Sequence, residues 1–590
     1  MAIIFKNSSS PSKDSTRTHQ KIAALFIFFT LTTLLLASFF RESFLDSREK
    51  QGLSDPAASA TPTPIPHPII RTACSRTLYP SLCFNTLSSI PISKNFITLR
   101  YILEFTMDAA EKSAARARTH VLGFFTFQDL ISQEKNALND CVEMLDQTLY
   151  ELGLAMDDLH AFPASIGHLH LLYANIKTLL SAAMTNQHTC IDGFSDLDES
   201  AFENRKDLKV KLHHLFAPIT RTISNCLSII TYMEAINESR IMNDHQMFVK
   251  KISPNRFPAW ISSSDRILME RRRNMKPNIT VASDGSGDYR LIAEAIKMAP
   301  ERSKNRFVIK IKAGVYNENV KITREKINIM LIGDGMTKTI IKGSKNFVDG
   351  FSTFDSATLT VAGDKFLARD LTIINTSGPQ KYQAVAARVT SNSAFYRCNF
   401  SSYQDALFAH SLRQFYRECT IQGTIDFIFG NAAAIFQNCL ILVRKPIPGQ
   451  SNMITAQGRR DPNQNTGFSL QNCTILAAPD LKSAKRQHIS TFLGRPWGNH
   501  SRTVVMKSYL GDLIHPQGWY TWDNYSSLDT VEYIEHLNYG PGSNTRHRVT
   551  WKGYKKNCSE EKARQFTVGK FLHEADHWLE STGFPLFTGS

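Results

Sequence analysis

The C-terminal half of the chain repeats a short apolar pattern about every twenty residues, and this period most limits the folds open to it. Five segments share an outline of apolar, polar, Cys-or-Asp and apolar positions: 366–373, 395–400, 415–421, 435–441 and 469–475. Cys398, Cys419 and Cys439 are 21 and 20 residues apart. The repeat predicts a mainly β solenoid that adds one coil per repeat and stacks equivalent residues. A β-sandwich is the alternative, although its strands usually recur at nearer ten residues.

The preceding region, residues 69–234, has the period of helices instead. Apolar residues recur every three or four positions at Leu138, Val142, Leu145, Leu149, Leu152 and Met156, and again from Ile166 to Ala183. We expect two antiparallel helices joined near Pro163 within an all-α bundle. Antiparallel packing would bring Cys141 to Cys190 and form a disulfide. Cys74 and Cys83 make the natural second pair, which leaves Cys226 without an obvious partner.

The N-terminal segment predicts that the chain is targeted to the secretory pathway. Residues 22–40 contain no charged side chain, and basic residues precede them in segment 1–21, which we expect to be cytosolic. We interpret 22–40 as an uncleaved transmembrane signal anchor, with a cleaved signal peptide as the alternative. Residues 41–68 include a proline-rich spacer. Eight glycosylation triplets agree with a lumenal destination: Asn237, Asn278, Asn375, Asn399, Asn472, Asn499, Asn524 and Asn557.

The positive charge of the chain lies in its C-terminal part. Of 68 Lys and Arg and 53 Asp and Glu in the whole chain, residues 276–590 hold 39 and 26, a surplus of 13 out of 15. An extended anionic partner is therefore plausible, whether nucleic acid, anionic lipid or an acidic polysaccharide. Hydrophobic residues at 42% and charged residues at 21% exclude disordered, collagen-like and polytopic membrane classes.

Asp405 and Asp426 are the strongest candidates for chemistry. They are 21 residues apart, which is one coil of the predicted solenoid and stacks both carboxylates on one face. Two neighbouring acids cannot ionise equally easily, so one becomes a proton donor while the other stays charged. Arg495 could support the charged acid, and Gln383 and Gln404 offer amide donors. The alternative is that these polar residues only complete hydrogen-bond ladders at turns.

We expect neither a cofactor nor a metal. The glycine-containing segments after Gly285 and Gly333 lack the third glycine of a dinucleotide loop and the Gly-Lys pair of a phosphate loop. Cys and His residues show no metal spacing. No Gly-x-Ser-x-Gly elbow is present, which weakens a serine-hydrolase interpretation.

Five motifs together resemble the plant pectin methylesterases. They are GTIDFIFGNA from Gly423, TAQGRRDPNQNTG from Thr455, LGRPW from Leu493, GVYNE from Gly314 and the tail YGPGSNTRHRVTWKGY with FTVGKFL. The resemblance covers most of 278–590. Residues 69–234, with two cysteine pairs, resemble the pectin methylesterase inhibitor domain that precedes the enzyme in longer members, and 235–277 would link the two.

The resemblance implies a right-handed parallel β-helix that hydrolyses methyl esters of polygalacturonate. Asp426 would be the nucleophile, and Asp405 the acid and then the base. Gln383 and Gln404 would hold the oxyanion, and Arg495 would keep Asp426 ionised. Gln383 and Arg495 would also contact the sugars. So would four aromatic side chains, those of Phe408, Phe429, Trp497 and Trp519. A Cys398–Cys419 disulfide is expected because stacked strands lie about 4.8 Å apart.

The sequence departs from the family pattern beside the acid. Ala406 and Phe408 stand where the family usually has Thr and Tyr, and Ser402 replaces a common Gly. A pectin binder without turnover is therefore one rival hypothesis. A protein whose helical region inhibits other esterases is a second. A β-helical lyase is a third, although it would need an acidic calcium cluster that the sequence lacks.

The resemblance also implies regulation and partners. Longer members are cut between the domains at a basic motif, and 266–269 or Arg271–Arg273 would serve a subtilisin-like protease. The helical domain would hold the enzyme inactive until then. Pectin is the expected partner, with inhibitor proteins as further candidates, no nucleic acid, and membrane contact only through the anchor. The destination would be the cell wall, with a membrane-anchored precursor.

Overall fold

The computed structural model describes residues 67–90, 97–127, 130–161, 169–194, 203–244, 276–484, 489–522, 528–556 and 558–572. The expected membrane segment at 22–40, nearly all of the spacer at 41–68 and the processing motifs at 266–273 lie outside these residues. Within the described ranges, no helix combines the length and the hydropathy that crossing a bilayer requires.

The N-terminal part of the described chain is helical. It begins with the short helices α2 (Pro68–Cys74) and α3 (Pro80–Leu87). Four long helices follow: α4 (Leu99–Phe124), α5 (Ser132–His160), α6 (Leu169–Asp192) and α7 (Glu203–Asp244). Leu138, Leu145 and Leu152 of the predicted stripe are buried in one core with residues of the other long helices. Helix α7 continues beyond the predicted end at 234, because no Gly or Pro interrupts the chain there.

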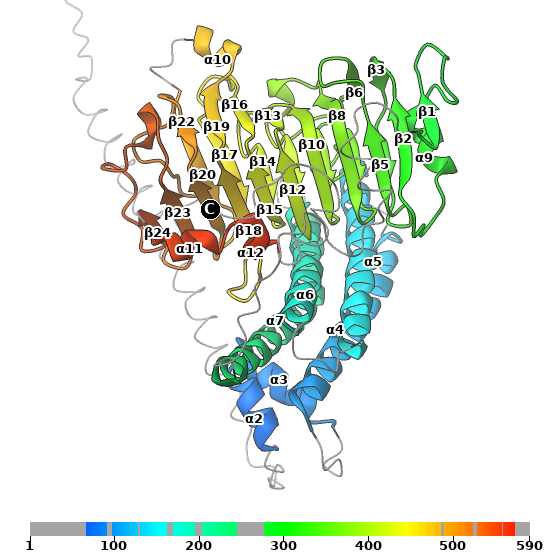
Figure 1. Ribbon diagram of the computed structural model, residues 1–590. Helices are drawn as coiled ribbons and strands as arrows, with labels where there is room; N and C mark the ends of the chain where they lie inside the picture. The colour runs from blue at the N-terminus through cyan, green and yellow to red at the C-terminus, as the bar shows by residue number, and fades with distance from the viewer. Residues whose placement is uncertain are drawn as a thin grey trace, which may run out of the picture. The chain divides into compact units, whose positions relative to one another are not determined.

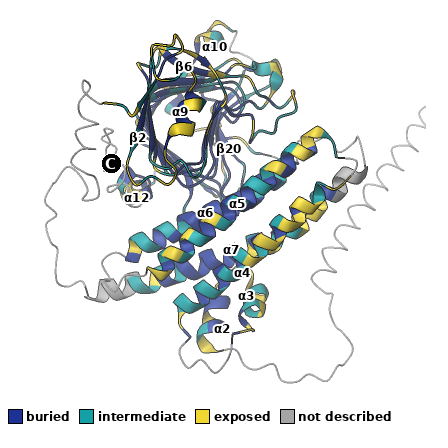
Figure 2. Ribbon diagram, turned by 90° about the vertical axis from the view of Figure 1, so that its right-hand side faces the viewer, coloured by how far each residue is buried: buried dark blue, intermediate teal, exposed yellow. Residues whose placement is uncertain are grey.

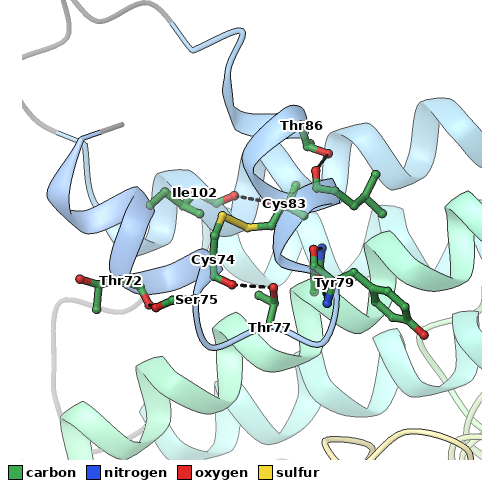
Figure 3. Close-up of a disulfide and its surroundings, with 11 residues drawn as sticks. Thr72, Cys74, Ser75, Thr77, Tyr79, Cys83, Thr86 and Ile102 are labelled. Carbon is green, nitrogen blue, oxygen red and sulfur yellow. Dashed lines mark hydrogen bonds between the residues drawn. A yellow bond between two sulfur atoms is a disulfide. The ribbon is translucent and has the colours of Figure 1, made fainter. Parts of the chain in front are cut away.

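Two disulfides hold this helical part together, and both join the pairs that the sequence predicted. Cys74 of α2 is bonded to Cys83 of α3, and Figure 3 shows this bond beside Ile102 of α4. Cys141 near the start of α5 is bonded to Cys190 near the end of α6, which is the outcome of antiparallel packing. Cys226 is buried and free.

The C-terminal part coils into parallel strands, as Figure 1 shows. Seventeen strands among the described residues form one sheet: β1 (Ile279–Val281), β2 (Phe307–Ile311), β3 (Gly314–Asn317), β5 (Ile329–Ile332), β6 (Thr339–Gly343), β8 (Phe366–Asn375), β10 (Ser393–Ser401), β12 (Arg413–Arg417), β13 (Thr420–Gly423), β15 (Ala433–Gln437), β16 (Leu440–Val443), β18 (Gly467–Gln471), β19 (Thr474–Ala477), β21 (Arg502–Met506), β22 (Tyr509–Leu510), β23 (Glu532–His536) and β24 (Tyr554–Lys556).

A second sheet carries the candidate site. Its seven strands, in spatial order, are β20 (Thr491–Pro496), β17 (Asn452–Gln457), β14 (Ile428–Gly430), β11 (Leu407–Ala409), β9 (Ala387–Val389), β7 (Leu359–Val361) and β4 (Val320–Ile322). Neighbouring strands of this sheet belong to successive coils and run parallel. The predicted solenoid is therefore confirmed as a parallel β-helix.

The β-helix encloses a core of stacked equivalent side chains. Figure 2 looks along the coils, which surround this core, with helix α9 (Ile292–Met298) at the near end. Phe395, Tyr416 and Phe436 come from three successive coils, and their ring centroids are 5.1 and 4.8 Å apart in nearly parallel planes. The sequence repeat thus corresponds to equivalent side chains that stack on one another in successive coils of the core.

A left-handed bend explains the polar position of each repeat. Arg397, Glu418, Asn438 and Asn472 all have positive φ, between 49° and 55°, and each directly precedes one of the regularly spaced cysteines. The bend turns the chain within β10 at Arg397 and between two short strands of the same coil at Glu418, Asn438 and Asn472. Only a few residue types tolerate this conformation well, and Asn is among them, so polar residues recur there.

The disulfide predicted between Cys398 and Cys419 does not form. Both thiols are buried and free, and that of Cys419 lies 3.4 and 3.5 Å from the carbonyl oxygens of Arg417 and Phe395. Stacked side chains of parallel strands point the same way, so their Cβ atoms stay near the strand spacing of about 4.8 Å. A disulfide needs about 3.8 Å between Cβ atoms. The prediction assumed that cysteines at the strand spacing are close enough to form a disulfide, but this spacing is too wide.

Candidate active site

Asp405 and Asp426 occupy equivalent positions in neighbouring coils. Each lies two residues before a strand of the second sheet, and the register pairs Leu407 with Ile428. Both aspartates have positive φ, 63° and 50°, which is a strained conformation for a residue with a side chain. Their side chains line one cavity and are 8% and 5% exposed. The spacing of 21 residues thus stacks the two acids as the sequence predicted.

Arg495 of β20 holds Asp426 through two hydrogen bonds. Its Nε donates to Oδ1 at 2.9 Å, and its Nη2 donates to Oδ2 at 2.5 Å. Such a paired geometry fixes the orientation of the carboxylate. Burial raises the pKa of Asp426 above its usual value, and the charge of Arg495 opposes the rise. Arg495 therefore orients the carboxylate and limits the cost of ionising it, but burial has the larger effect on its pKa.

Gln383 and Gln404 lie beside the two acids. They are paired as an isolated parallel bridge in successive coils, one residue before Ala384 and Asp405 respectively. Both line the cavity that holds the aspartates. An amide NH₂ at this place can donate to an oxygen that gains negative charge during a reaction.

Aromatic rings form the walls of the cavity. Phe408 and Phe429 are stacked with their centroids 4.2 Å apart, and Trp497 lies 6.1 Å from Phe429. All three line the cavity. Stacked rings of this kind suit the flat apolar faces of sugars.

Trp519 was expected in the cleft, and that expectation is wrong. It is 1% exposed, its ring packs against Tyr533, and its Nε1 donates to Glu535 at 3.2 Å. Trp522, which sequence reasoning missed, lines the cavity instead, and the Arg495 guanidinium lies 4.0 Å from its ring centroid. Both tryptophans belong to one short motif, so residue type alone could not separate them.

The family departures fall in two different environments. Ala406 is fully buried and points into the core of the β-helix, so a hydroxyl at this position would not reach the cavity. Ser402 donates to the carbonyl oxygen of Ala384 at 2.5 Å, inside the coil. Only Phe408, in place of a common Tyr, changes the wall of the cavity itself.

Helices α5 and α6 cover the cavity, whose volume is about 570 Å³. Asp140, Thr189, Asp192 and Gly193 of this helical part line it together with the candidate residues. Arg460, which also lines the cavity, donates to Asp192 at 3.0 Å. Thr189 shares a hydrogen bond of 2.9 Å with His410. The helical part of the same chain therefore forms one wall of the cavity that holds the two aspartates.

One loop of the β-helix forms hydrogen bonds with the helices beside the cavity. It lies in the segment TAQGRRDPNQNTG, between β17 and β18. Asp461 accepts from Ser224 at 2.6 Å, and Asn465 donates to Thr178 at 2.9 Å. Gln464 donates to the carbonyl oxygen of Ser181 at 3.2 Å. This motif thus serves contact between the two parts of the chain, which its sequence did not reveal. Among the residues described, no group of three or more Cys, His, Asp or Glu is placed to hold a metal ion.

Two stacked carboxylates beside amide donors, in an aromatic groove on a parallel β-helix, define a class of β-helical enzymes that act on polysaccharides. The chain belongs to the pectinesterase family, because residues 278–576 match that family. Residues 68–229 match the family described as plant invertase/pectin methylesterase inhibitor. The resemblance inferred from the motifs is confirmed.

Known relatives match both parts. Pectinesterase 2 of Arabidopsis thaliana is 44% identical over 540 residues, which are 88% of this chain and 89% of the relative. Probable pectinesterase/pectinesterase inhibitor 61 of the same plant is 38% identical over 99% of this chain and 97% of its own. The solved pectin methylesterase from carrot is 52% identical with a TM-score of 0.53, and 54% of this chain covers all of it. A little more than half of this chain thus matches the whole of the solved carrot chain.

Proposed function

We propose that this chain hydrolyses methyl esters of cell-wall pectin, releasing methanol and leaving pectate. The observation that carries the proposal is the Asp426 carboxylate, fixed by Arg495 and stacked beside Asp405 in one cavity of a pectinesterase-family β-helix. An oriented, buried carboxylate is suited to attack a carbonyl carbon. A second acid one coil away is suited to move the proton.

The reaction runs in two steps. An Asp426 oxygen attacks the ester carbonyl carbon, and the resulting oxyanion accepts hydrogen bonds from the amides of Gln383 and Gln404. The intermediate collapses, the bond to methanol breaks, and Asp405 gives its proton to the leaving oxygen. Asp405, now ionised, takes a proton from water, which attacks the acyl-enzyme and restores Asp426. The product is the free carboxylate of the sugar.

We propose that the helical domain keeps the enzyme inactive before processing. Support comes from the helical residues that line the cavity and from the ion pair between Asp192 and Arg460 at its wall. Cleavage by a subtilisin-like protease at 266–269 or Arg271–Arg273 would free the β-helix. The address of the chain is then the secretory pathway, ending in the cell wall, with a precursor that is membrane-anchored through 22–40.

Methanol release tests the main proposal. The fragment 276–590 is incubated with methylated pectin, and the full-length chain is assayed in parallel. The fragment should release methanol and the full-length chain should release far less. Asp426→Asn should lower the rate by about four orders of magnitude or more, as losing a catalytic group does in other hydrolases. Asp529→Asn, which changes an exposed carboxylate, is the control and should leave the rate unchanged.

Two outcomes would favour the rivals. Pectin binding without methanol release from the fragment would identify a binder that has lost turnover. Inhibition of other pectinesterases by the isolated residues 67–244 would support an inhibitor that acts in trans. A folded Asp426→Asn fragment that kept full activity would contradict the proposed nucleophile.

A further inference from the structure

A row of side-chain positions extends the cavity along the second sheet. The strand register aligns the cleft residues Arg495, Ala456, Phe429 and Phe408 with Arg388, then with Thr360 and Lys321. Arg388 lies two strands from Phe429, or about 10 Å at the usual strand spacing. A polymer that follows the sheet past the two aspartates therefore reaches Arg388 and then Lys321.

Arg388 is a buried cation with unmet hydrogen-bonding capacity. Its side chain is 2% exposed, and its guanidinium lies 3.2 Å from the ring centroid of Phe354. Nη2 donates to Glu143 at 3.2 Å, but Nε and Nη1 contact no hydrogen-bond acceptor among the residues described. A buried guanidinium with free N–H groups is unfavourable until it meets an anion, and its planar fork matches a carboxylate.

In the intact chain, the carboxylate of Glu143 of α5 is the anion that lies beside Arg388. One carboxylate oxygen accepts from Arg388 and the other from Lys321 at 2.8 Å. Although burial alone would raise it, the pKa of Glu143 lies below its usual value because these two cations stabilise the ionised form. The helical domain thus inserts a carboxylate between two cations of the groove, and its departure would leave both cations without that partner.

We propose that Arg388 and Lys321 form a subsite for a free carboxylate of the substrate polymer, and that Glu143 stands in for this carboxylate before processing. The subsite would bind an unesterified uronate at some distance from the ester that meets Asp426. The inference rests on the proposed pectin esterase function. It adds the residues that would recognise such a carboxylate, Arg388 and Lys321.

Steady-state kinetics with two substrates tests the subsite. The fragment 276–590 and its variants hydrolyse fully methylated polygalacturonate and a half-methylated preparation of the same length. Arg388→Gln should raise KM for the half-methylated polymer by about 10-fold to 100-fold, the usual loss for one hydrogen bond to a charged group. Its kcat on the fully methylated polymer should not change. Arg388→Lys should recover part of the affinity.

Two further variants complete the test. Lys321 is about half exposed in the intact chain, so Lys321→Gln cannot disturb the core, and it should raise the same KM about 2-fold to 5-fold. Arg546→Gln removes an exposed charge outside the groove, and both KM values should stay unchanged. If Arg388→Gln does not fold, the KM of Lys321→Gln for the half-methylated polymer is the test of the subsite.

A binding measurement separates this proposal from the function on which it rests. Calorimetry with unesterified oligogalacturonate uses Asp426→Asn protein, which needs no turnover, with and without Arg388→Gln. Loss of affinity in the double variant supports the subsite whether or not methanol is released. Equal affinity, or equal changes of KM on both polymers, would overturn it. An unsubstituted fragment that releases no methanol from either polymer would instead refute the esterase function.

Discussion

Asp405 and Asp426 share a left-handed backbone conformation that aims both carboxylates into the same cavity. Such a conformation costs about 1–3 kcal/mol for a residue with a side chain, so the surrounding coils must hold it in place. The hydrogen bond from the Asp405 amide to the Ile425 carbonyl, at 3.0 Å, is one such restraint between the coils. At this scale, position along the coil decides which polar residues can act together.

Gln383→Ala tests the oxyanion role. If its amide stabilises negative charge only in the transition state, kcat should fall about 100-fold to 1,000-fold while KM changes little. Methanol release by the fragment 276–590 measures both constants. Gln422→Ala, in the other sheet, is the matched control and should leave kcat as it is. An unchanged kcat in Gln383→Ala would remove this residue from the mechanism.

The two tryptophans of the GWYTW segment should respond differently to substitution. Trp519→Ala opens a cavity in the core and should lower the free energy of unfolding by about 3–5 kcal/mol. Trp522→Ala should leave stability nearly unchanged and raise KM for pectin several-fold, because it removes a ring from the cavity wall. Denaturant titration and initial rates measure the two effects. The reverse pattern would contradict the assignment of Trp522 to the cavity.

Helices α5 and α6 are the elements that we expect to regulate access to the cavity. Asp140 of α5 lines the cavity and accepts a hydrogen bond from Ser352 of the β-helix. Burial raises the pKa of Asp140 to about 7, while Ser352 and Arg388 oppose the rise and the nearby Asp355 and Glu143 add to it. The intact chain therefore favours the protonated form of Asp140.

The closing contact should weaken as pH rises. The pKa of Asp140 is higher while the helical part is bound to the β-helix than its ordinary value near 4. The bound state is therefore most stable below pH 4, and it loses the contribution of Asp140 as the pH rises from about 4 to about 7. After the linker is cut, the helical part should dissociate from the β-helix more readily at pH 7 than at pH 5. The pKa values of the buried His188 and His410 are lowered and act in the opposite sense, so the comparison needs a variant.

Asp140→Asn supplies that comparison. The amide resembles the protonated acid and does not titrate, so this variant should lose the weakening that Asp140 causes between pH 5 and pH 7. Size-exclusion chromatography of the cleaved protein at each pH reports the bound fraction. Identical pH dependence in the variant and the unsubstituted chain would mean that Asp140 does not control release.

Charge acts at the scale of the whole molecule. The surplus of 13 positive charges in residues 276–590 should hold the enzyme on an anionic polymer whose charge grows as esters are removed. Adhesion to wall material should therefore be lost at about 1 M salt, where the screening length is about 3 Å. Stepwise salt elution measures this. Full retention at that salt concentration would contradict the charge argument.

The sequence was enough to predict the solenoid, the two helical disulfides and the clustering of Asp405, Asp426, Gln383, Gln404 and Arg495. It could do so because these depend on period and spacing, which fix how residues repeat along a coil. Only the tertiary structure separated Trp519 from Trp522, left Cys398 and Cys419 unbonded, and paired Glu143 with Arg388. These depend on side-chain direction and on contacts between segments far apart in the chain, and linear spacing carries no record of either.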